Sequence, residues 1–238
     1  MGHGVNNSNP PVALPLDVYE ALYQRKSIRA FRSDPVPRAT IARILAAAAR
    51  APSGTNIQPW QVRVLSGNGR ARLVDAVLAF RAANPGVEKW AYAYYPAKWK
   101  EPYLARRRKV GWDLYGLLGI KRSDRDLIAA QHNRNFTFFD APVGLIFTID
   151  SDLERGSWLD YGMFIQSVLL AAEAEGLGTC PQACWVAHPD IVASTLAFAA
   201  NEQLVCGVAL GYPDWDSPVN QLTTERAALD DFVTFVDA

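Results

Sequence analysis

The sequence is poor in sulfur and in imidazole: its 238 residues include three cysteines, two methionines and three histidines. The number of cysteines is odd, and we expect no secretory leader before Cys180, Cys184 and Cys206. We therefore expect no disulfide framework and a reducing compartment. No second cysteine pair or nearby histidine completes a zinc-ligand set around Cys180 and Cys184. We therefore expect no metal site and three thiols that behave as small buried hydrophobic groups.

The sequence also lacks net charge and long apolar runs. Lysine plus arginine equals aspartate plus glutamate at 24 each, which argues against a dedicated binder of nucleic acid or of a membrane surface. Gln166, Glu173 and Glu175 interrupt the longest apolar stretch, so we expect no membrane span. Residues 1–14 contain no apolar signal-peptide core, and we expect a flexible arm there on a cytoplasmic protein.

Hydrophobic periodicity predicts one domain of mixed α and β structure over residues 15–238. The apolar residues Ile41, Ile44, Leu45 and Ala48 have the spacing of a core-facing helix. Gly176 to Gln182 is predicted to be a tight glycine-containing link, and residues 229–235 either one more strand or a segment that packs on a neighbour. The other predictions are a helix capped by Asp17, helices over 70–82, 127–139, 160–174 and 188–197, and strands over 61–65, 143–149 and 204–210.

The segment from residue 84 to residue 125 differs in composition from the rest. It interleaves eight tryptophans and tyrosines with ten basic and only four acidic residues. One interpretation is a mobile aromatic lid over a flat ligand, because aromatic faces stack on conjugated rings. A dimer clasp or a solvated surface helix is the alternative, and single-stranded nucleic acid is disfavoured because no binding module is recognisable.

Two polar stretches are candidates for binding a ligand. The loop from Pro52 to Trp60 is stiffened by two prolines and offers hydrogen bonds in both directions, which suits a flat ligand with an uncharged polar edge. The stretch from Arg25 to Arg32 holds four cations that either spread into solvent or surround an anion. A phosphate at one end and an amide-edged ring at the other describe flavin mononucleotide (FMN).

Four motifs occur in one order along the chain. They are Arg25-x-Ser27-x-Arg29-x-Phe31, the loop from Pro52 to Trp60, Gly176-x-Gly178-Thr179-x-Pro181, and Gly207-x-x-x-Gly211-Tyr212-Pro213. In this combination the chain resembles the nitroreductase family of flavoenzymes from about residue 15 to residue 238. The resemblance implies an α+β fold, with a mixed or antiparallel sheet surrounded by helices. It also implies an intertwined homodimer with two FMN sites at the interface.

The resemblance further implies the residues that hold the flavin. Arg25, Lys26, Ser27 and Arg29 match the residues that hold the phosphate and the ring edge. Arg226 matches a further residue that binds the phosphate. Pro52, Ser53, Asn56 and Gln58 match the loop that reaches the flavin from the partner subunit. Pro181, Gln182 and Ala183 match the turn that presents a backbone N–H to the reactive nitrogen of the ring, although many relatives have an acid and a glycine after this proline.

The implied activity is FMN-dependent reduction of small electron-poor nitroaromatic compounds by NADH or NADPH in a ping-pong mechanism. The alternatives are an enone or quinone reductase, an aromatic dehalogenase of the same fold, or a flavin-binding or sensing protein without turnover. No catalytic acid is predicted, because His3, His132 and His188 each fit a structural or solvent-exposed role better. The cofactor would carry the chemistry, and the protein would supply stacking and orientation.

Overall fold

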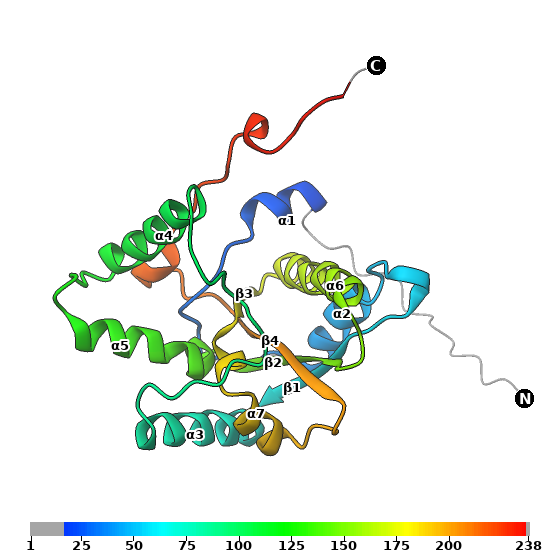
Figure 1. Cartoon of the computed structure of the whole chain (residues 1–238), viewed down its shortest axis with the longest axis horizontal. Helices are drawn as coiled ribbons and strands as arrows, with labels where there is room; N and C mark the ends of the chain where they lie inside the picture. The colour runs from blue at the N-terminus through cyan, green and yellow to red at the C-terminus, as the bar shows by residue number, and fades with distance from the viewer. Residues whose placement is uncertain (1–16, 237–238) are drawn as a thin grey trace, which may run out of the picture.

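The computed structural model describes residues 17–236, and the predicted arm lies outside this range. The chain forms a mixed α+β structure in which helices surround a sheet, as predicted (Figure 1). In chain order the helices and strands are α1 (Val18–Gln24), α2 (Arg38–Ala48), β1 (Gln61–Ser66), α3 (Gly67–Ala83), α4 (Tyr103–Leu117), α5 (Arg125–Asn133), β2 (Val143–Asp150), α6 (Arg155–Ala174), β3 (Gly178–Gln182), α7 (Pro189–Leu196) and β4 (Glu202–Gly211). Short 3-10 helices are η1 (Gly54–Asn56), η2 (Arg134–Asp140), η3 (Cys184–Ala187), η4 (Pro218–Gln221) and η5 (Leu229–Asp231).

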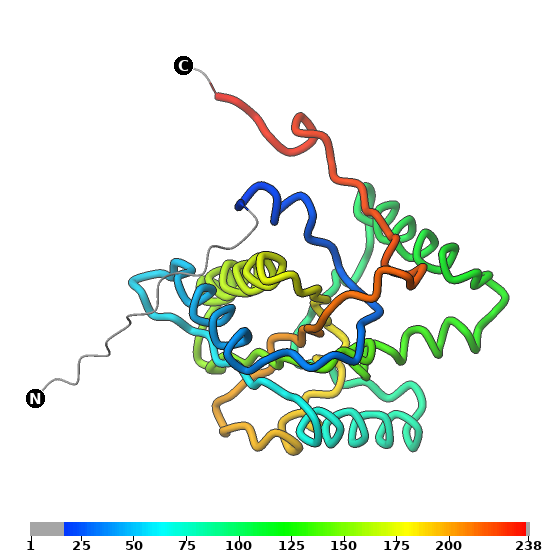
Figure 2. The backbone as a smooth tube through the Cα atoms, turned by 180° about the vertical axis from the view of Figure 1, so that it is seen from behind, coloured from blue at the N-terminus to red at the C-terminus, as the bar shows by residue number. Residues whose placement is uncertain are grey.

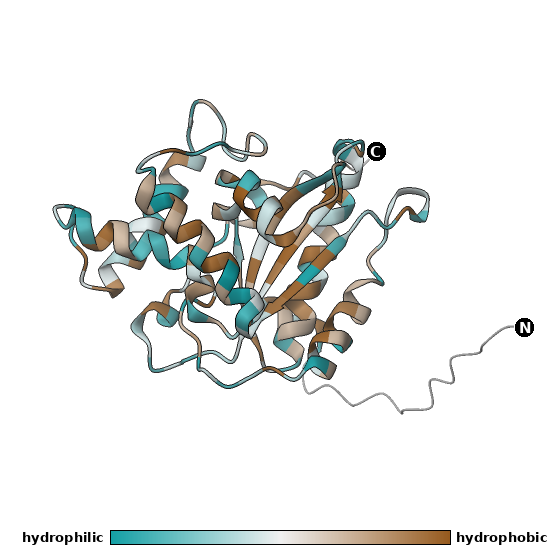
Figure 3. Ribbon diagram, turned by 90° about the horizontal axis from the view of Figure 1, so that it is seen from below, coloured by the Kyte–Doolittle hydropathy of each residue, from teal (hydrophilic) through white to brown (hydrophobic). Residues whose placement is uncertain are grey.

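The sheet has the strand order β1-β2-β4-β3, and every neighbouring pair is antiparallel. Strand β2 is buried along almost its whole length because helices cover both faces of the sheet. Leu145 and Phe147 point into a core shared with α2 and α6, whereas the intervening Ile146 points into a second core shared with α3 and α7. The strands are accordingly rich in hydrophobic residues in the centre of the molecule (Figure 3).

The prediction for residues 176–182 was wrong in part. Gly176 does end α6 with a positive φ of 73°, but residues 178–182 form β3 and pair with β4 at the edge of the sheet. Pro181 is tolerated there because an edge strand does not need every backbone N–H. A Cβ on Gly178 would lie 2.6 Å from Ile28 Cγ1, so this glycine allows the N-terminal segment to approach β3 closely.

The prediction of a continuous helix over 127–139 was also wrong, because α5 ends at Asn133. The chain then turns through η2, where Phe138 and Phe139 have positive φ values of 55° and 53°. These backbone angles bury both phenyl rings in the second core, and Phe138 stacks on Trp185 at a centroid distance of 4.4 Å. Burial of two aromatic side chains therefore overrides the local preference for a helix.

The segment 84–125 is not wholly an excursion from the core. Lys89 N and Ala91 N donate to the carbonyl oxygens of Ala187 and Val186, so its first part is anchored beside η3. Its second part contains α4, in which no residue is buried. Residues 229–235 form no strand, and Leu229, Phe232 and Phe235 are exposed, which leaves contact with a neighbour as the remaining interpretation of the tail.

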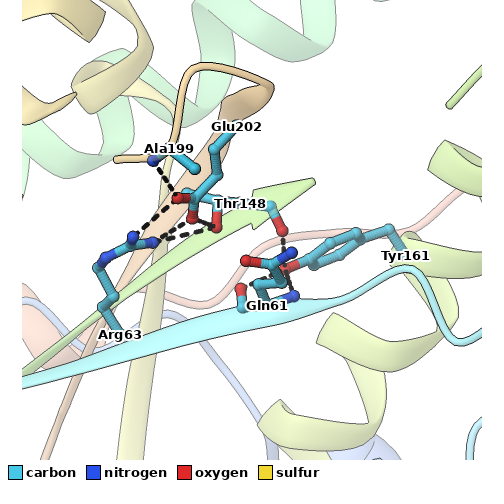
Figure 4. A network of polar contacts seen from close by, with 6 residues as sticks. All are labelled: Gln61, Arg63, Thr148, Tyr161, Ala199 and Glu202. Carbon is cyan, nitrogen blue, oxygen red and sulfur yellow. Dashed lines mark hydrogen bonds and ion pairs between the residues drawn. The ribbon is translucent and has the colours of Figure 1, made fainter. Parts of the chain in front are cut away.

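A polar network joins three strands inside the sheet (Figure 4). Arg63 on β1 forms a two-pronged ion pair with Glu202 on β4, in which Nη2 lies 2.8 Å from Oε2. Thr148 on β2 and Ala199 N also donate to the Glu202 carboxylate. The hydrogen bonds from Arg63, together with those from Thr148 and the Ala199 backbone, lower the pKa of Glu202 to about 2.

This network predicts an acid-sensitive contribution to stability. The pKa of Glu202 is lower in the folded protein than in the unfolded chain, so the stabilisation is complete above pH 4.5 and is lost as the pH falls towards 2. We expect Glu202→Gln to lower the free energy of unfolding by about 2–3 kcal/mol at neutral pH. The free energy of unfolding of the variant should also fall less than that of the parent protein as the pH is lowered from 4.5 to 2. Chemical denaturation across this range measures both effects.

The matched control is Asp190→Asn, which removes the negative charge of the exposed ion pair between Lys89 and Asp190. It should change the free energy of unfolding by less than about 1 kcal/mol, because exposed ion pairs contribute little. Equal effects of the two substitutions would show that the Glu202 network does not stabilise the sheet.

Candidate functional site

The basic stretch that follows α1 is fixed on the edge of the sheet. Ile28 N donates to Thr179 O at 2.9 Å, and Ser27 forms a parallel bridge with Thr179. The stretch then runs beside the chain that leaves β4, where Arg32 N donates to Tyr212 O (Figure 2). Two segments almost two hundred residues apart therefore build one surface.

Asn220 locks this arrangement. Its Oδ1 accepts hydrogen bonds from Arg29 N at 2.8 Å and Ala30 N at 3.3 Å, and its Nδ2 donates to Ala30 O and Asp214 O. Asn220 is 1% exposed, so it is a buried polar anchor between the two segments. The side-chain hydrogen bonds of Thr223 and Thr224 stay within residues 221–226.

Arg226 lies near enough to Arg25 for their charges to interact. The pKa of Arg25 is lowered first by burial and then by the neighbouring positive charge of Arg226, while Glu173 acts in the opposite direction. Burial also raises the pKa of Glu173, against the effects of Arg25 and Lys26. Arg25 is partly buried, whereas Arg226 is exposed. An anion such as a phosphate would stabilise these two neighbouring positive charges.

The remaining residues of the basic stretch are partly occupied by other contacts. Lys26 Nζ lies 5.0 Å from the ring centroid of Trp215, and Arg29 Nη1 donates to Ser27 O at 3.2 Å. Cys180 is buried beside them, and its burial raises the pKa of the thiol against the effects of Arg29, the Ser27 hydroxyl and Arg25. The thiol is therefore protonated and acts as packing, as expected for a buried cysteine.

The end of β3 borders a cavity of about 240 Å³. Its walls include the aromatic residues Tyr92, Trp158 and Tyr161, and Pro181 to Ala183 form one side. Tyr92 is held by a hydrogen bond from its hydroxyl to Val205 O at 2.6 Å and by an edge contact with Trp158 at 4.8 Å. The cavity suits a flat conjugated group, and the aromatic composition of the segment 84–125 was the signal for it.

Gln182 lines this cavity, and its side chain is fixed by hydrogen bonds. Its side chain is 2% exposed, donates from Nε2 to Asn135 O at 2.6 Å and accepts from Trp185 Nε1 at 3.3 Å. Because both ends of the amide are occupied, the side chain fixes the turn and leaves only main-chain groups for a ligand. The role of the backbone near Gln182 and Ala183 stays a prediction.

Sequence reasoning missed Thr179 as a candidate site residue. Within residues 17–236, its Oγ1 is one of two buried side-chain polar atoms that have no hydrogen-bond partner, and it belongs to the strand residue that pairs with Ser27. Gly-Thr-x-Pro, the motif that contains it, was the available signal. A buried hydroxyl without a partner costs free energy, which makes it a candidate donor to a ligand.

The loop from Pro52 to Gln58 is shaped by its own hydrogen bonds. Gln58 N donates to Ser53 Oγ at 3.0 Å, and Gly54 N donates to Asp160 Oδ2 at 3.0 Å. Asn56 and Gln58 have positive φ values of 62° and 50°, and the loop is largely exposed. The loop thus has the strained backbone that often marks binding loops.

Within one chain, the loop does not join the other candidate residues. It contacts Asp160 near the beginning of α6, whereas Arg25 interacts with Glu173 near its end, and thirteen residues of helix correspond to about 20 Å. No residue of the loop lines the 240 Å³ cavity beside Pro181. The structure therefore brings Arg25 and Arg226 together and places Pro181 to Ala183 at a cavity, but it leaves Ser53 and Asn56 apart.

Two further observations concern the described residues as a whole. None of the helices between residues 17 and 236 is long and apolar enough to cross a membrane. In the same range, histidine, cysteine, aspartate and glutamate side chains nowhere gather in a group of three that could hold a metal ion.

Comparison with known proteins gives consistent results. A profile of the Nitroreductase family matches residues 22–212. A 4-nitrobenzoate reductase from Nocardioides sp. (strain LMS-CY) is 38% identical over 96% of this chain and 94% of its own length, and a nitrobenzene nitroreductase from Ectopseudomonas oleovorans is 38% identical over 91% and 96%.

Solved structures agree with these matches. The FMN- and NADPH-dependent nitroreductase NfnB from Sphigopyxis sp. strain HMH superposes with a TM-score of 0.91 at 38% identity, covering 94% of this chain and 100% of that one. The FMN-dependent nitroreductase NfnB from Mycobacterium smegmatis, solved in complex with NADPH, gives a TM-score of 0.86 at 31% identity, with coverage of 93% and 100%.

Proposed function

Because the chain belongs to the nitroreductase family, we propose that it is an FMN-dependent oxidoreductase that reduces nitroaromatic compounds with NADPH or NADH. Relatives with 38% identity carry the names of nitroaromatic reductases, and a similar structure is named as FMN- and NADPH-dependent. The observation on this chain that supports the proposal best is the aromatic cavity at Pro181, at the end of the strand β3 on which Thr179 O holds the basic stretch after α1. The proposal includes a cytoplasmic location, where NADPH and NADH are available.

The residues present fit FMN by their chemistry. Arg25 and Arg226, with Lys26 and Ser27 next to them, offer charged donors for a phosphate, and Arg29 extends the positive surface. The cavity beside Pro181 offers flat aromatic walls and no charged lining residue, which suits a conjugated ring. When bound, FMN would supply the transfer of hydride and electrons, as flavins do in such enzymes.

The residues of the chain would then act by binding, orientation and exclusion of water. Tyr92 and Trp158 would cover one side of the ring, because their side chains are fixed by contacts with β4 and with each other. The backbone at Gln182 and Ala183 would donate to the ring, held in place by the buried Gln182 amide. We include in the proposal that the reductant and the nitro compound use the same site in turn.

The proposal also includes a homodimer in which the loop from Pro52 to Gln58 serves the FMN of the partner subunit. Helix α6 supports this part, because one side of it packs in the core while Leu159 and Met163 on the other side are 71% and 36% exposed. The neighbouring α1 also exposes large side chains, among them Tyr19 and Tyr23. An apolar surface of this extent on a single chain is typical of a subunit interface.

The visible spectrum of the purified protein tests the function. We expect flavin absorption bands, bleaching by NADPH without oxygen, and recovery of the bands when a nitroarene such as nitrobenzene is added. A protein without flavin would contradict the proposal. Bleaching without recovery in the presence of several nitroarenes would instead favour a flavin-binding protein that has no nitroreductase activity.

The same sample tests the interface. Size-exclusion chromatography with light scattering should show the flavin absorption in the peak of a dimer, because each site needs the loop of the other subunit. A monomer that retains stoichiometric FMN would refute the assignment of Pro52, Ser53, Asn56 and Gln58 to the partner's site.

A further inference from the structure

A second cavity lies among helices α3, α4 and α5. It has a volume of about 560 Å³ and is formed by the C-terminal end of α3, the turn that follows it, the end of α4 and one side of α5. In Figure 1, α1 and the C-terminal tail lie above the sheet, α3 lies below it, and α5 lies to its left. The cavity shares no lining residue with the cavity beside Pro181 or with the basic stretch.

The lining combines positive charge with apolar walls. Arg81 and Arg125 are its charged residues, and no carboxylate belongs to the lining. Leu78, Tyr115 and Ile128 provide the apolar part of the wall. A cavity of this size with a few polar groups and a mainly apolar wall has the character of a site for a small organic ligand.

Arg81 is held rigidly at this cavity. Its Nη1 donates to His188 Nε2 at 2.9 Å, its Nη2 donates to Asn133 Oδ1 at 3.0 Å, and its guanidinium lies 4.2 Å from the ring centroid of Phe136. A guanidinium that is already ordered loses little further freedom when it binds a carboxylate.

The positive charge of Arg81 is only partly balanced. Glu88 is its acidic neighbour at 3.9 Å, which is beyond hydrogen-bonding distance, and the buried Nε has no hydrogen-bond partner in the described part of the chain. Arg125 adds a second positive charge at the exposed beginning of α5. The site therefore favours an anion over a neutral or cationic ligand.

We propose that this cavity binds a small aromatic monocarboxylate, with the carboxylate towards Arg81 and Arg125 and the ring against Leu78, Tyr115 and Ile128. The fork of donors on arginine matches the geometry of a carboxylate, and the apolar wall stabilises the ring by removing its surface from water. This site is separate from the proposed FMN site and does not depend on it.

The test is a titration of the full-length protein, with its FMN, with 4-fluorobenzoate and with the neutral 4-fluorobenzamide, followed by fluorine NMR. Binding of the acid should be at least about tenfold tighter than binding of the amide. Arg125→Gln should weaken binding of the acid by about tenfold or more, and Ala129→Trp should abolish it by filling the cavity. Ala130→Trp, on the same helix but outside the lining, should leave it unchanged.

The absorption of the flavin is recorded during the same titration. The flavin absorption should show no change that follows the binding curve measured by NMR, because the cavity lies away from the proposed FMN site. Equal affinity for acid and amide, binding that neither Arg125→Gln nor Ala129→Trp weakens, or a flavin shift with the same dissociation constant would each overturn the proposal. If the protein carried no flavin, the NMR titration would still decide the question, so failure of the two proposals can be told apart.

Discussion

Replacing Arg25 and Arg226 together with alanine is expected to raise the dissociation constant for FMN by at least about a hundredfold. Hydrogen bonds to a charged group contribute about 1.5–3 kcal/mol each, and the double substitution removes both guanidinium groups from the proposed phosphate site. The protein should therefore purify with little flavin. Fluorescence titration of the apoprotein with FMN measures the dissociation constant directly.

A second measurement separates binding from folding. The pKa of Arg25 is lowered first by burial and then by the positive charge of Arg226, so both effects disfavour the charged Arg25 in the apoprotein. The double variant should therefore unfold at the same temperature as the parent apoprotein or at a higher one. Arg38→Ala combined with Arg72→Ala is the charge-matched control, because both residues are exposed on other helices, and it should bind FMN normally. Unchanged affinity in the R25A/R226A variant would show that the phosphate binds elsewhere.

Gly207→Ala should be the most destabilising single substitution of those considered. A Cβ at this position of β4 would overlap the indole ring of Trp185 and lie 2.6 Å from its Nε1. Trp185 cannot move aside, because it is fully buried, stacks on Phe138 and donates to Gln182. We expect the free energy of unfolding to fall by about 3 kcal/mol, at the upper end of the cost of overpacking a core. Thermal unfolding of the apoprotein measures the change.

Gly111→Ala is the control for this prediction. Gly111 lies inside α4 and no atom lies within 4 Å of the position of its Cβ, so alanine should be neutral or stabilising by up to about 1 kcal/mol. Because Trp185 also holds the Gln182 amide, Gly207→Ala should weaken FMN binding as well. If the G207A variant unfolded at the parent temperature, the close packing of β4 on Trp185 would be refuted.

Regular elements were predictable from the sequence where the hydrophobic pattern was strong. Periodicity and continuous apolar runs predicted the helix that carries Ile41 to Ala48 and strands over 61–65, 143–149 and 204–210, which correspond to α2, β1, β2 and β4. The edge strand β3 was missed because glycine and proline dominate its five residues and mimic a turn. Its strand character comes from pairing with β4, which a local pattern does not contain.

The components of the site were predicted better than their arrangement. The residue types around Arg25 and in the loop from Pro52 pointed to a phosphate and a polar-edged ring, and only the family resemblance assigned Arg226 to the same phosphate. The path of the chain after β4, which Asn220 fixes, depends on tertiary contacts that the residue pattern does not contain. The resemblance likewise assigned the loop to the partner's site, and the distance of the loop from the cavity within one chain is a property of the tertiary structure.

The pairing of the two chain segments at the edge of the sheet also bears on the order of events during synthesis. The stretch after α1 emerges early from the ribosome, but its partners at Tyr212, Asp214 and Asn220 are made about 180 residues later. Contacts between such distant segments form late and slowly in folding. A nascent chain could complete most of its helices before it has a phosphate site. FMN would therefore bind only after most of the chain has folded and would not assist the early steps of folding.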